Sequence, residues 1–271
     1  MDIAFIVGFP RSGTTYLQSL LSTQEKIISL PETHFFSLVS KGFYDVNQDL
    51  DQIDLTEIDR RLKKMMDFNL SSECLATLEN MNQNGIGKKN LFSSILSDYF
   101  EQKHVSIESK IVLEKTPDHI RHIVEIKGHL PNARFICMIR NPYKSINSFY
   151  ERLTEYRQPY TQLARQWRES YNTVDHFIKE FSDSIILVKY EDLRESRNKV
   201  MDRIGGFLGL QVDLNKLENH RKETARLITS NEPWKQDNFN IPPTTLNMEI
   251  PFLERLKIWI ILHREMKVHG Y

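Results

Sequence analysis

The sequence is poor in cysteine and carries no net charge: it has two cysteines and 36 basic against 36 acidic side chains in 271 residues. Cys74 and Cys137 stand far apart, and Cys137 lies in an apolar run, so a disulfide framework is excluded and a reducing compartment is expected. A chain without net charge is not attracted as a whole to nucleic acid. An anionic ligand would therefore need a local binding site.

Long hydrophobic runs are also missing. The apolar residues 3–7 end at Gly8 and lack the basic start and cleavage site of a signal peptide, and the run 258–262 is equally short. These features predict a cytoplasmic protein without stable membrane association. His, Cys, Asp and Glu residues do not recur at the spacing of a metal site, so no metal is expected.

Short β-rich runs alternate with segments of helical character. Such alternation is typical of a parallel sheet whose faces are both covered by helices. The predicted strands are 3–7, 134–139 and 185–188, with weaker candidates at 26–30 and 110–113. The predicted helices are 13–21, 118–129, 142–154, 160–181 and 251–267. We therefore predict an α/β, P-loop-like three-layer fold with a central parallel sheet flanked by helices.

The region of about 42–103 has a different sequence pattern from the rest of the chain. It contains predicted helices at 55–68 and 91–101 and a polar loop at 80–90. We interpret it as a helical insertion within a single domain of residues 1–271. Its role is either a cap over an acceptor pocket or an ordinary peripheral layer.

The strongest motif is Gly8-Phe-Pro-Arg-Ser-Gly-Thr-Thr15, directly after the first predicted strand. A strand, a glycine-bearing turn and a helix start direct backbone N–H groups toward a phosphate. The candidate ligands in this phosphate loop are Pro10, Arg11, Ser12, Gly13, Thr14 and Thr15. A Walker A loop has lysine where this chain has Thr14, and that difference disfavours an ATP-dependent kinase.

A second candidate anion site follows the strand 134–139. Arg140 lies just past its end, where open α/β sheets bind ligands, and Ser148 follows about two helical turns later. Ser145 is a weaker alternative to Ser148. A third segment, Tyr190-Glu-Asp-Leu193 and the helix after it, is expected to be mainly architectural, although Tyr190 could touch a nucleotide.

Together these motifs resemble those of the sulfotransferases that depend on 3′-phosphoadenosine-5′-phosphosulfate (PAPS). The resemblance spans about residues 3–36 and 110–210. It implies that the loop binds the 5′-phosphosulfate and that Arg140 and Ser148 bind the 3′-phosphate. It also implies that PAPS is the co-substrate and PAP (3′,5′-ADP) the product, without a metal, and that the acceptor is a hydroxyl or amine of a small molecule or glycan.

Catalytic candidates lie in two further segments. Glu32-Thr-His34-Phe-Phe resembles the corresponding segment of glycan sulfotransferases, which implies Glu32 as general base and His34 as its assistant, or the reverse. The alternative is that Glu32 caps the next helix and His34 packs beneath it. Lys115 is a candidate cation near the sulfonate or a solvated lysine, and Arg11 is expected to stabilise the leaving group.

Other features are ambiguous. His119, Arg121 and His122 are expected at the surface of one helix. Four aromatic residues either stack on an acceptor or belong to the core: Tyr156, Tyr160, Trp167 and Tyr171. The segment 221–237 lacks the Arg-Lys-Gly signature of cytosolic family members, and Trp234 within it is expected to pack. The competing functions are an ATP-dependent P-loop kinase and a nucleotide-binding module that has lost its catalysis.

Overall fold

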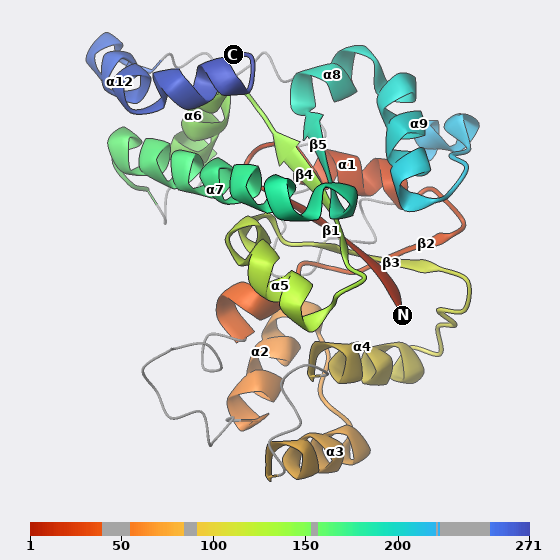
Figure 1. Cartoon of the computed structure of the whole chain (residues 1–271). Coiled ribbons are helices and arrows are strands. Elements are labelled where there is room, and N and C mark those ends of the chain that lie inside the picture. Colours follow the sequence, from red (N-terminus) through yellow and green to blue (C-terminus); the bar gives the residue numbers. More distant parts are fainter. Residues whose placement is uncertain (40–54, 84–90, 153–156, 221, 223–249) are drawn as a thin grey trace.

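In a computed structural model, the chain forms a five-stranded parallel sheet between two layers of helices (Figure 1). The structure describes residues 1–39, 55–83, 91–152, 157–220, 222 and 250–271. The strands are β1 (Asp2–Gly8), β2 (Ile27–Ser29), β3 (Ile111–Lys115), β4 (Arg134–Ile139) and β5 (Ile185–Lys189), in the spatial order β2-β3-β1-β4-β5. The predicted fold class is confirmed.

Alternation along the strands divides the core into two layers. Phe5 and Val7 of β1 face one layer, whereas Ala4 and Ile6 face the other, because successive side chains of a strand point to opposite faces. The first layer contains η3 (Pro117–His122), α5 (Ile123–His129), α6 (Pro142–Arg152), α7 (Tyr160–Phe181), η5 (Ser182–Ser184) and α12 (Phe252–Val268). The second contains α1 (Thr14–Leu21), α8 (Tyr190–Glu195), α9 (Arg197–Leu208) and η6 (Leu214–Asn219).

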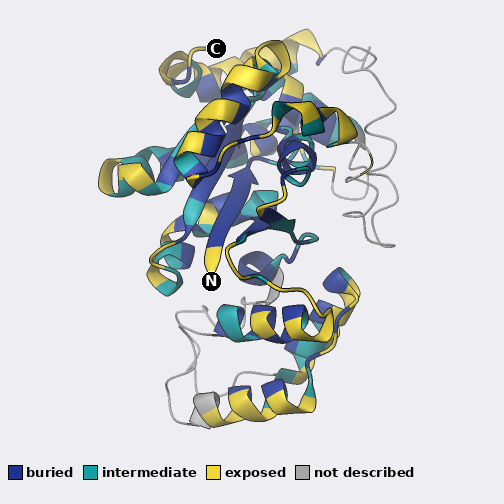
Figure 2. Cartoon of the chain, turned by 90° about the vertical axis from the view of Figure 1, so that its right-hand side faces the viewer, coloured by how far each residue is buried: buried dark blue, intermediate teal, exposed yellow. Residues whose placement is uncertain are grey.

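The described helices of the region 42–103 are continuous with the first layer. They are α2 (Leu55–Met66), α3 (Ser72–Gln83) and α4 (Leu91–Gln102), and they follow a π-helical turn, η1 (Phe35–Val39). Phe92 of α4 contacts Phe35 and Phe36, with ring centroids 4.8 and 5.2 Å apart, and also Phe5 of the sheet at 6.1 Å. Figure 2 shows buried residues along the inner sides of these helices and through the sheet.

Several predicted boundaries were wrong for local reasons. The predicted helix 55–68 ends at Met66, because Asp67 adopts a positive φ of 49°. A helix at 72–83 was missed, and it runs into the start of the predicted loop 80–90, of which residues 84–90 lie outside the described part. The predicted helix 118–129 is divided into the 3₁₀ turn η3 and α5.

Candidate active site at the carboxyl edge of the sheet

The carboxyl ends of all five strands meet at one edge, which is where open α/β sheets bind ligands. β1 is central in the sheet: β3 and β2 lie on one side of it, and β4 and β5 lie on the other. The phosphate loop leaves β1 between the end of β3, at Lys115, and the end of β4, which leads to Arg140. The residues predicted from motifs far apart in sequence are therefore brought to the same edge.

The phosphate loop has an unusual backbone. Arg11 has a φ of 72° and Gly13 a φ of 92°, both in the left-handed region. A Cβ atom on Gly13 would lie 2.3 Å from the ring of Tyr190, so this position requires glycine for both its conformation and its packing. The non-glycine Arg11 in this region costs about 1–2 kcal/mol, a strain typical of functional loops. α1 then begins at Thr14, which directs the N-terminus of a helix at the loop.

The loop contacts the second candidate anion site directly. Nη1 of Arg140 donates a hydrogen bond of 2.9 Å to the carbonyl of Arg11, and Nε of Arg11 donates one of 3.2 Å to Oγ of Ser148. The Arg140 guanidinium also lies 4.5 Å from the centre of the Tyr190 ring. The alternative residue Ser145 donates instead to main-chain carbonyls of its own helix. Tyr190 therefore contacts both anion-binding segments.

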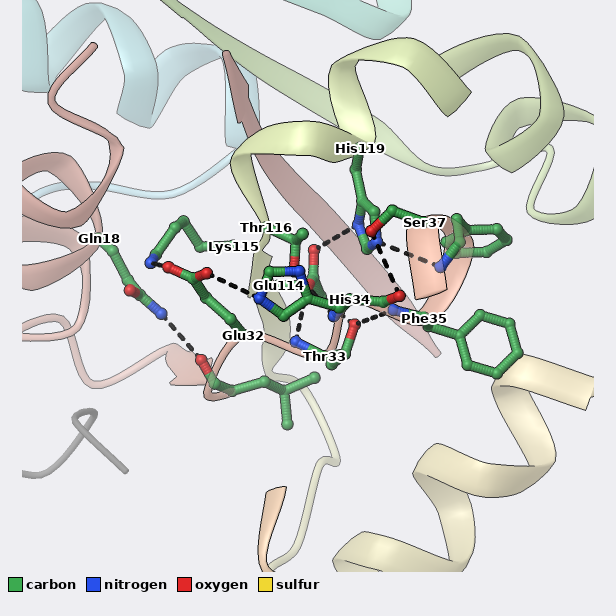
Figure 3. A network of polar contacts seen from close by, with 12 residues as sticks. Gln18, Glu32, Thr33, His34, Phe35, Ser37, Glu114, Lys115, Thr116 and His119 are labelled. Carbon is green, nitrogen blue, oxygen red and sulfur yellow. Dashed lines mark hydrogen bonds and ion pairs between the residues drawn. The ribbon is translucent and has the colours of Figure 1, made fainter. Parts of the chain in front are cut away.

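Glu32 lies between two of the other predicted residues, as Figure 3 shows. Its Oε1 accepts a hydrogen bond from Nζ of Lys115, and its Oε2 is 3.1 Å from Nε2 of His34. Lys115 is only 1% exposed, so the prediction of a solvated lysine is wrong. Gln18 of α1 donates to the Leu30 carbonyl at 2.8 Å, which joins this segment to the helix that follows the phosphate loop.

A buried carboxylate organises the backbone that carries Glu32 and His34. Four consecutive N–H groups each donate to a side chain: Thr33 to Glu114 Oε1 (3.2 Å), His34 to Thr116 Oγ1 (3.1 Å), Phe35 to Thr33 Oγ1 (3.2 Å) and Phe36 to His119 Nε2 (3.2 Å) (Figure 3). Glu114 is the centre of this network, since it also accepts from the hydroxyls of Thr33 and Thr116. The donors of Phe35 and Phe36 are orphan N–H groups in the first turn of η1, and those of Thr33 and His34 lie just before it. Glu32 itself contacts Lys115 and His34.

His119 corrects the prediction of a surface histidine, because its side chain is completely buried. Its Nδ1 lies 3.0 Å from Oε2 of Glu114, while its Nε2 accepts the Phe36 N–H. Because Nε2 faces the Phe36 N–H, the hydrogen bond to the carboxylate is donated by the Nδ1–H of the ring. Burial acts to raise the pKa of Glu114, but its interactions with His119 and the hydroxyls of Thr116 and Thr33 outweigh burial and hold that pKa below its usual value.

The aromatic candidates belong to the core where the structure describes them. Trp167 and Tyr171 are fully buried and Tyr160 is 8% exposed, whereas Tyr156, Trp234 and most of 221–237 lie outside the described residues. Sequence reasoning missed the Tyr171 hydroxyl, which lies against the phosphate loop. Cys74 and Cys137 are both buried and unpaired with one another.

Within the described residues, no three His, Cys, Asp or Glu side chains form a group suited to a metal ion. None of the helices in the described ranges is both long and apolar enough to cross a membrane.

Comparison with known proteins identifies the family of this chain. Residues 4–214 match the model of the sulfotransferase family. No curated protein matches the sequence. Among solved structures, the sulfotransferase domain of the olefin synthase from Synechococcus PCC 7002 aligns with a TM-score of 0.61 and 22% identity, over 98% of this chain and 94% of that one.

Two other solved structures have a similar fold. The sulfotransferase domain from the curacin biosynthetic pathway aligns with a TM-score of 0.54 and 18% identity, over 97% of both chains. A mouse sulfotransferase complexed with PAP aligns with a TM-score of 0.53 and 12% identity, over 98% of this chain and 84% of that one. At these identities the likeness establishes the fold.

Proposed function

The chain belongs to the sulfotransferase family, and from that premise we propose that it transfers the sulfuryl group of PAPS to a hydroxyl or amine of an acceptor and releases PAP. The observation that carries the proposal is the contact between the two anion-binding segments. Arg140 and Ser148 both bond to Arg11 of the phosphate loop, although they lie more than 120 residues further along the chain. A nucleotide with phosphates at both its 5′ and 3′ positions suits two adjoining anion sites.

The proposed nucleotide ligands follow from this arrangement. The backbone of Pro10–Thr15 and the first turn of α1 surround the 5′-phosphosulfate, and Arg140 with Ser148 binds the 3′-phosphate. Thr14 stands where a Walker A loop has its lysine, so ATP would lack the cation that bridges its outer phosphates. This difference favours PAPS over ATP as the donor.

In the proposed reaction the acceptor oxygen attacks sulfur in line with the departing 5′-phosphate oxygen. The new bond joins the acceptor oxygen to sulfur, and the bond between sulfur and the phosphate oxygen breaks with its electron pair passing to PAP. Glu32 takes the acceptor proton, while Lys115 and His34 fix its two carboxylate oxygens. Arg11 stabilises the negative charge that develops on the leaving phosphate.

The acceptor is proposed to be a small molecule that enters on the side of α2–α4. The Glu-x-His-Phe-Phe segment favours a carbohydrate or another polyol. The solved relatives include domains of an olefin synthase and of the curacin pathway, which makes a lipid or polyketide hydroxyl the main alternative. A panel with both classes of acceptor, scored by PAP released from PAPS, separates the two.

The nucleotide assignment is tested by a thermal-shift comparison of 3′,5′-ADP, 2′,5′-ADP and 5′-AMP. A ligand at about 100 times its Kd stabilises the folded state by about 2.7 kcal/mol. We expect a clear upward shift in Tm with 3′,5′-ADP and much smaller shifts with the other two at equal concentration. Equal shifts with all three would contradict a site built for the 3′-phosphate.

A further inference from the structure

The hydroxyl of Tyr171 joins three parts of the nucleotide site. Tyr171 is fully buried on α7, and its Oη lies 2.8 Å from the carbonyl of Met138, 3.3 Å from the N–H nitrogen of Phe9 and 3.3 Å from Oγ of Ser12. Phe9 and Ser12 belong to the phosphate loop. Met138 is the penultimate residue of β4 and lies two residues before Arg140. One phenol therefore connects the loop with the strand that carries the second anion-binding segment.

The direction of each of these hydrogen bonds follows from which of the two atoms carries a proton. The Met138 carbonyl can only accept, so the single proton of Tyr171 is donated to it, and the Phe9 N–H can only donate. The remaining contact requires Ser12 to donate its hydroxyl proton to Tyr171. Burial raises the pKa of Tyr171 above its usual value, which keeps the phenol protonated.

The main-chain donor of Ser12 is also directed into the protein. Its N–H bonds to the Phe9 carbonyl at 3.1 Å, which closes the turn of the loop. The Ser12 side chain is fully buried. Both donors of Ser12 are thus used to hold the shape of the loop. The hydroxyls that the loop can offer a phosphate then come from Thr14 and Thr15.

We propose that Tyr171 is a positioning residue of the nucleotide site, and that Ser12 fastens the phosphate loop to Tyr171 instead of donating its hydroxyl proton to the phosphate. The identity of the ligand rests on the proposed function. The pairing holds the loop and the end of β4 in a fixed relation, so that both phosphates of one nucleotide meet their donors together. The sequence suggested Ser12 as a side-chain ligand of the phosphate, whereas in this proposal its hydroxyl holds the loop against Tyr171.

A double-mutant cycle with Ser12→Ala and Tyr171→Phe tests the proposal. Calorimetry with 3′,5′-ADP gives the Kd of each variant, and urea unfolding gives its midpoint. We expect each single change to weaken binding roughly tenfold and the double variant to bind within about threefold of Tyr171→Phe. Tyr99→Phe, a half-buried tyrosine of α4, is the control and should leave the Kd unchanged.

Two outcomes would overturn the proposal, and a third would overturn the proposed function that supplies its ligand. If the two losses multiply to about a hundredfold, Ser12 acts on the phosphate independently of Tyr171. If Tyr171→Phe lowers the urea midpoint but leaves the Kd unchanged, Tyr171 is structural and not a positioning residue. If the wild-type chain does not bind 3′,5′-ADP, the proposed function fails. The Ser12–Tyr171 bond is still tested in that case, because additive changes in unfolding free energy would exclude it and non-additive changes would support it.

Discussion

Arg140 donates a hydrogen bond of 2.9 Å from its guanidinium to the main-chain carbonyl of Arg11. The carbonyl fixes one nitrogen of Arg140, and the ring of Tyr190 supports the flat face of the guanidinium. The position of the cation that should read the 3′-phosphate therefore depends on the shape of the loop that should hold the 5′-phosphate.

Replacement of Arg140 should remove selectivity for the 3′-phosphate. A charge-assisted hydrogen bond contributes about 1.5–3 kcal/mol, so Arg140→Ala should weaken PAPS binding roughly 10–100-fold. Adenosine 5′-phosphosulfate, which lacks the 3′-phosphate, should lose much less affinity. The matched control is Arg134→Ala, whose guanidinium pairs with Asp2 at the other end of β4. Equal loss for the two nucleotides would refute the assignment of Arg140.

Replacement of Glu32 should separate turnover from nucleotide binding. General-base catalysis contributes typically 10²–10⁴-fold, so Glu32→Gln should reduce kcat by about that factor while the Kd for 3′,5′-ADP changes little. Glutamine can still accept from Lys115, which limits the loss of stability. Glu25→Gln, on the surface beside Lys216, is the control. An unchanged kcat would exclude Glu32 as the base.

The pH profile of kcat/KM decides between Glu32 and His34. A histidine base has an ordinary pKa near 6.5 and would produce a fall in rate as pH drops through that range. If Glu32 is the base, His34→Asn should retain the shape of the acid limb although its rate is lower. Loss of that limb in His34→Asn, together with substantial activity in Glu32→Gln, would reverse the two roles.

Glu114 should make the fold sensitive to acid. Its folded-state pKa is held below the ordinary value of 4.5, so its stabilising contribution is complete above about pH 4.5 and is lost as pH falls through the folded-state pKa. Glu114→Gln should lower the free energy of unfolding at pH 7 by roughly 1–3 kcal/mol and reduce the dependence of Tm on pH below 4.5. An unchanged slope of Tm against pH would show that Glu114 does not carry this acid sensitivity.

A pair of glycines tests the geometry of the phosphate loop. Gly13→Ala would force a Cβ against Tyr190 at a positive φ, so we expect marked destabilisation and loss of 3′,5′-ADP binding. Gly206→Ala lies within α9, where a Cβ meets nothing within 4 Å, and should stabilise the chain by about 0.5–1 kcal/mol. Urea unfolding compares the two variants. A mild effect of Gly13→Ala would mean that Tyr190 does not pack on the loop as described.

Local sequence patterns predicted the parts of the structure that depend on neighbouring residues. The apolar runs of β1, β4 and β5 and the glycines of the phosphate loop are recognisable without any partner. Lys115 and Arg140 could be assigned to the same edge because parallel strands end there together. The helix α3 was missed because few of its described side chains are buried, among them Cys74 and Leu78, so its apolar pattern is weak.

Long-range partners could not be predicted in this way. His119 lies in a segment with the polar pattern of a surface helix, and its burial depends on Glu114, on the Phe36 N–H and on the rings of Phe5 and Phe36. Pro117 begins a 3₁₀ turn that directs His119 inward. Tyr171 and Ser12 are 159 residues apart, and no local pattern relates them. The sequence therefore offered candidate side chains for the nucleotide site and missed the groups that contact them from distant parts of the chain.

The proposed function requires that the site bind a 3′-phosphorylated nucleotide. The most direct test is calorimetric titration of the purified chain with 3′,5′-ADP, with ADP, and with ATP in the presence of magnesium. We expect micromolar binding of 3′,5′-ADP and little heat from ADP or ATP. Tighter binding of ATP with magnesium would contradict the proposed function and would make phosphoryl transfer the leading hypothesis.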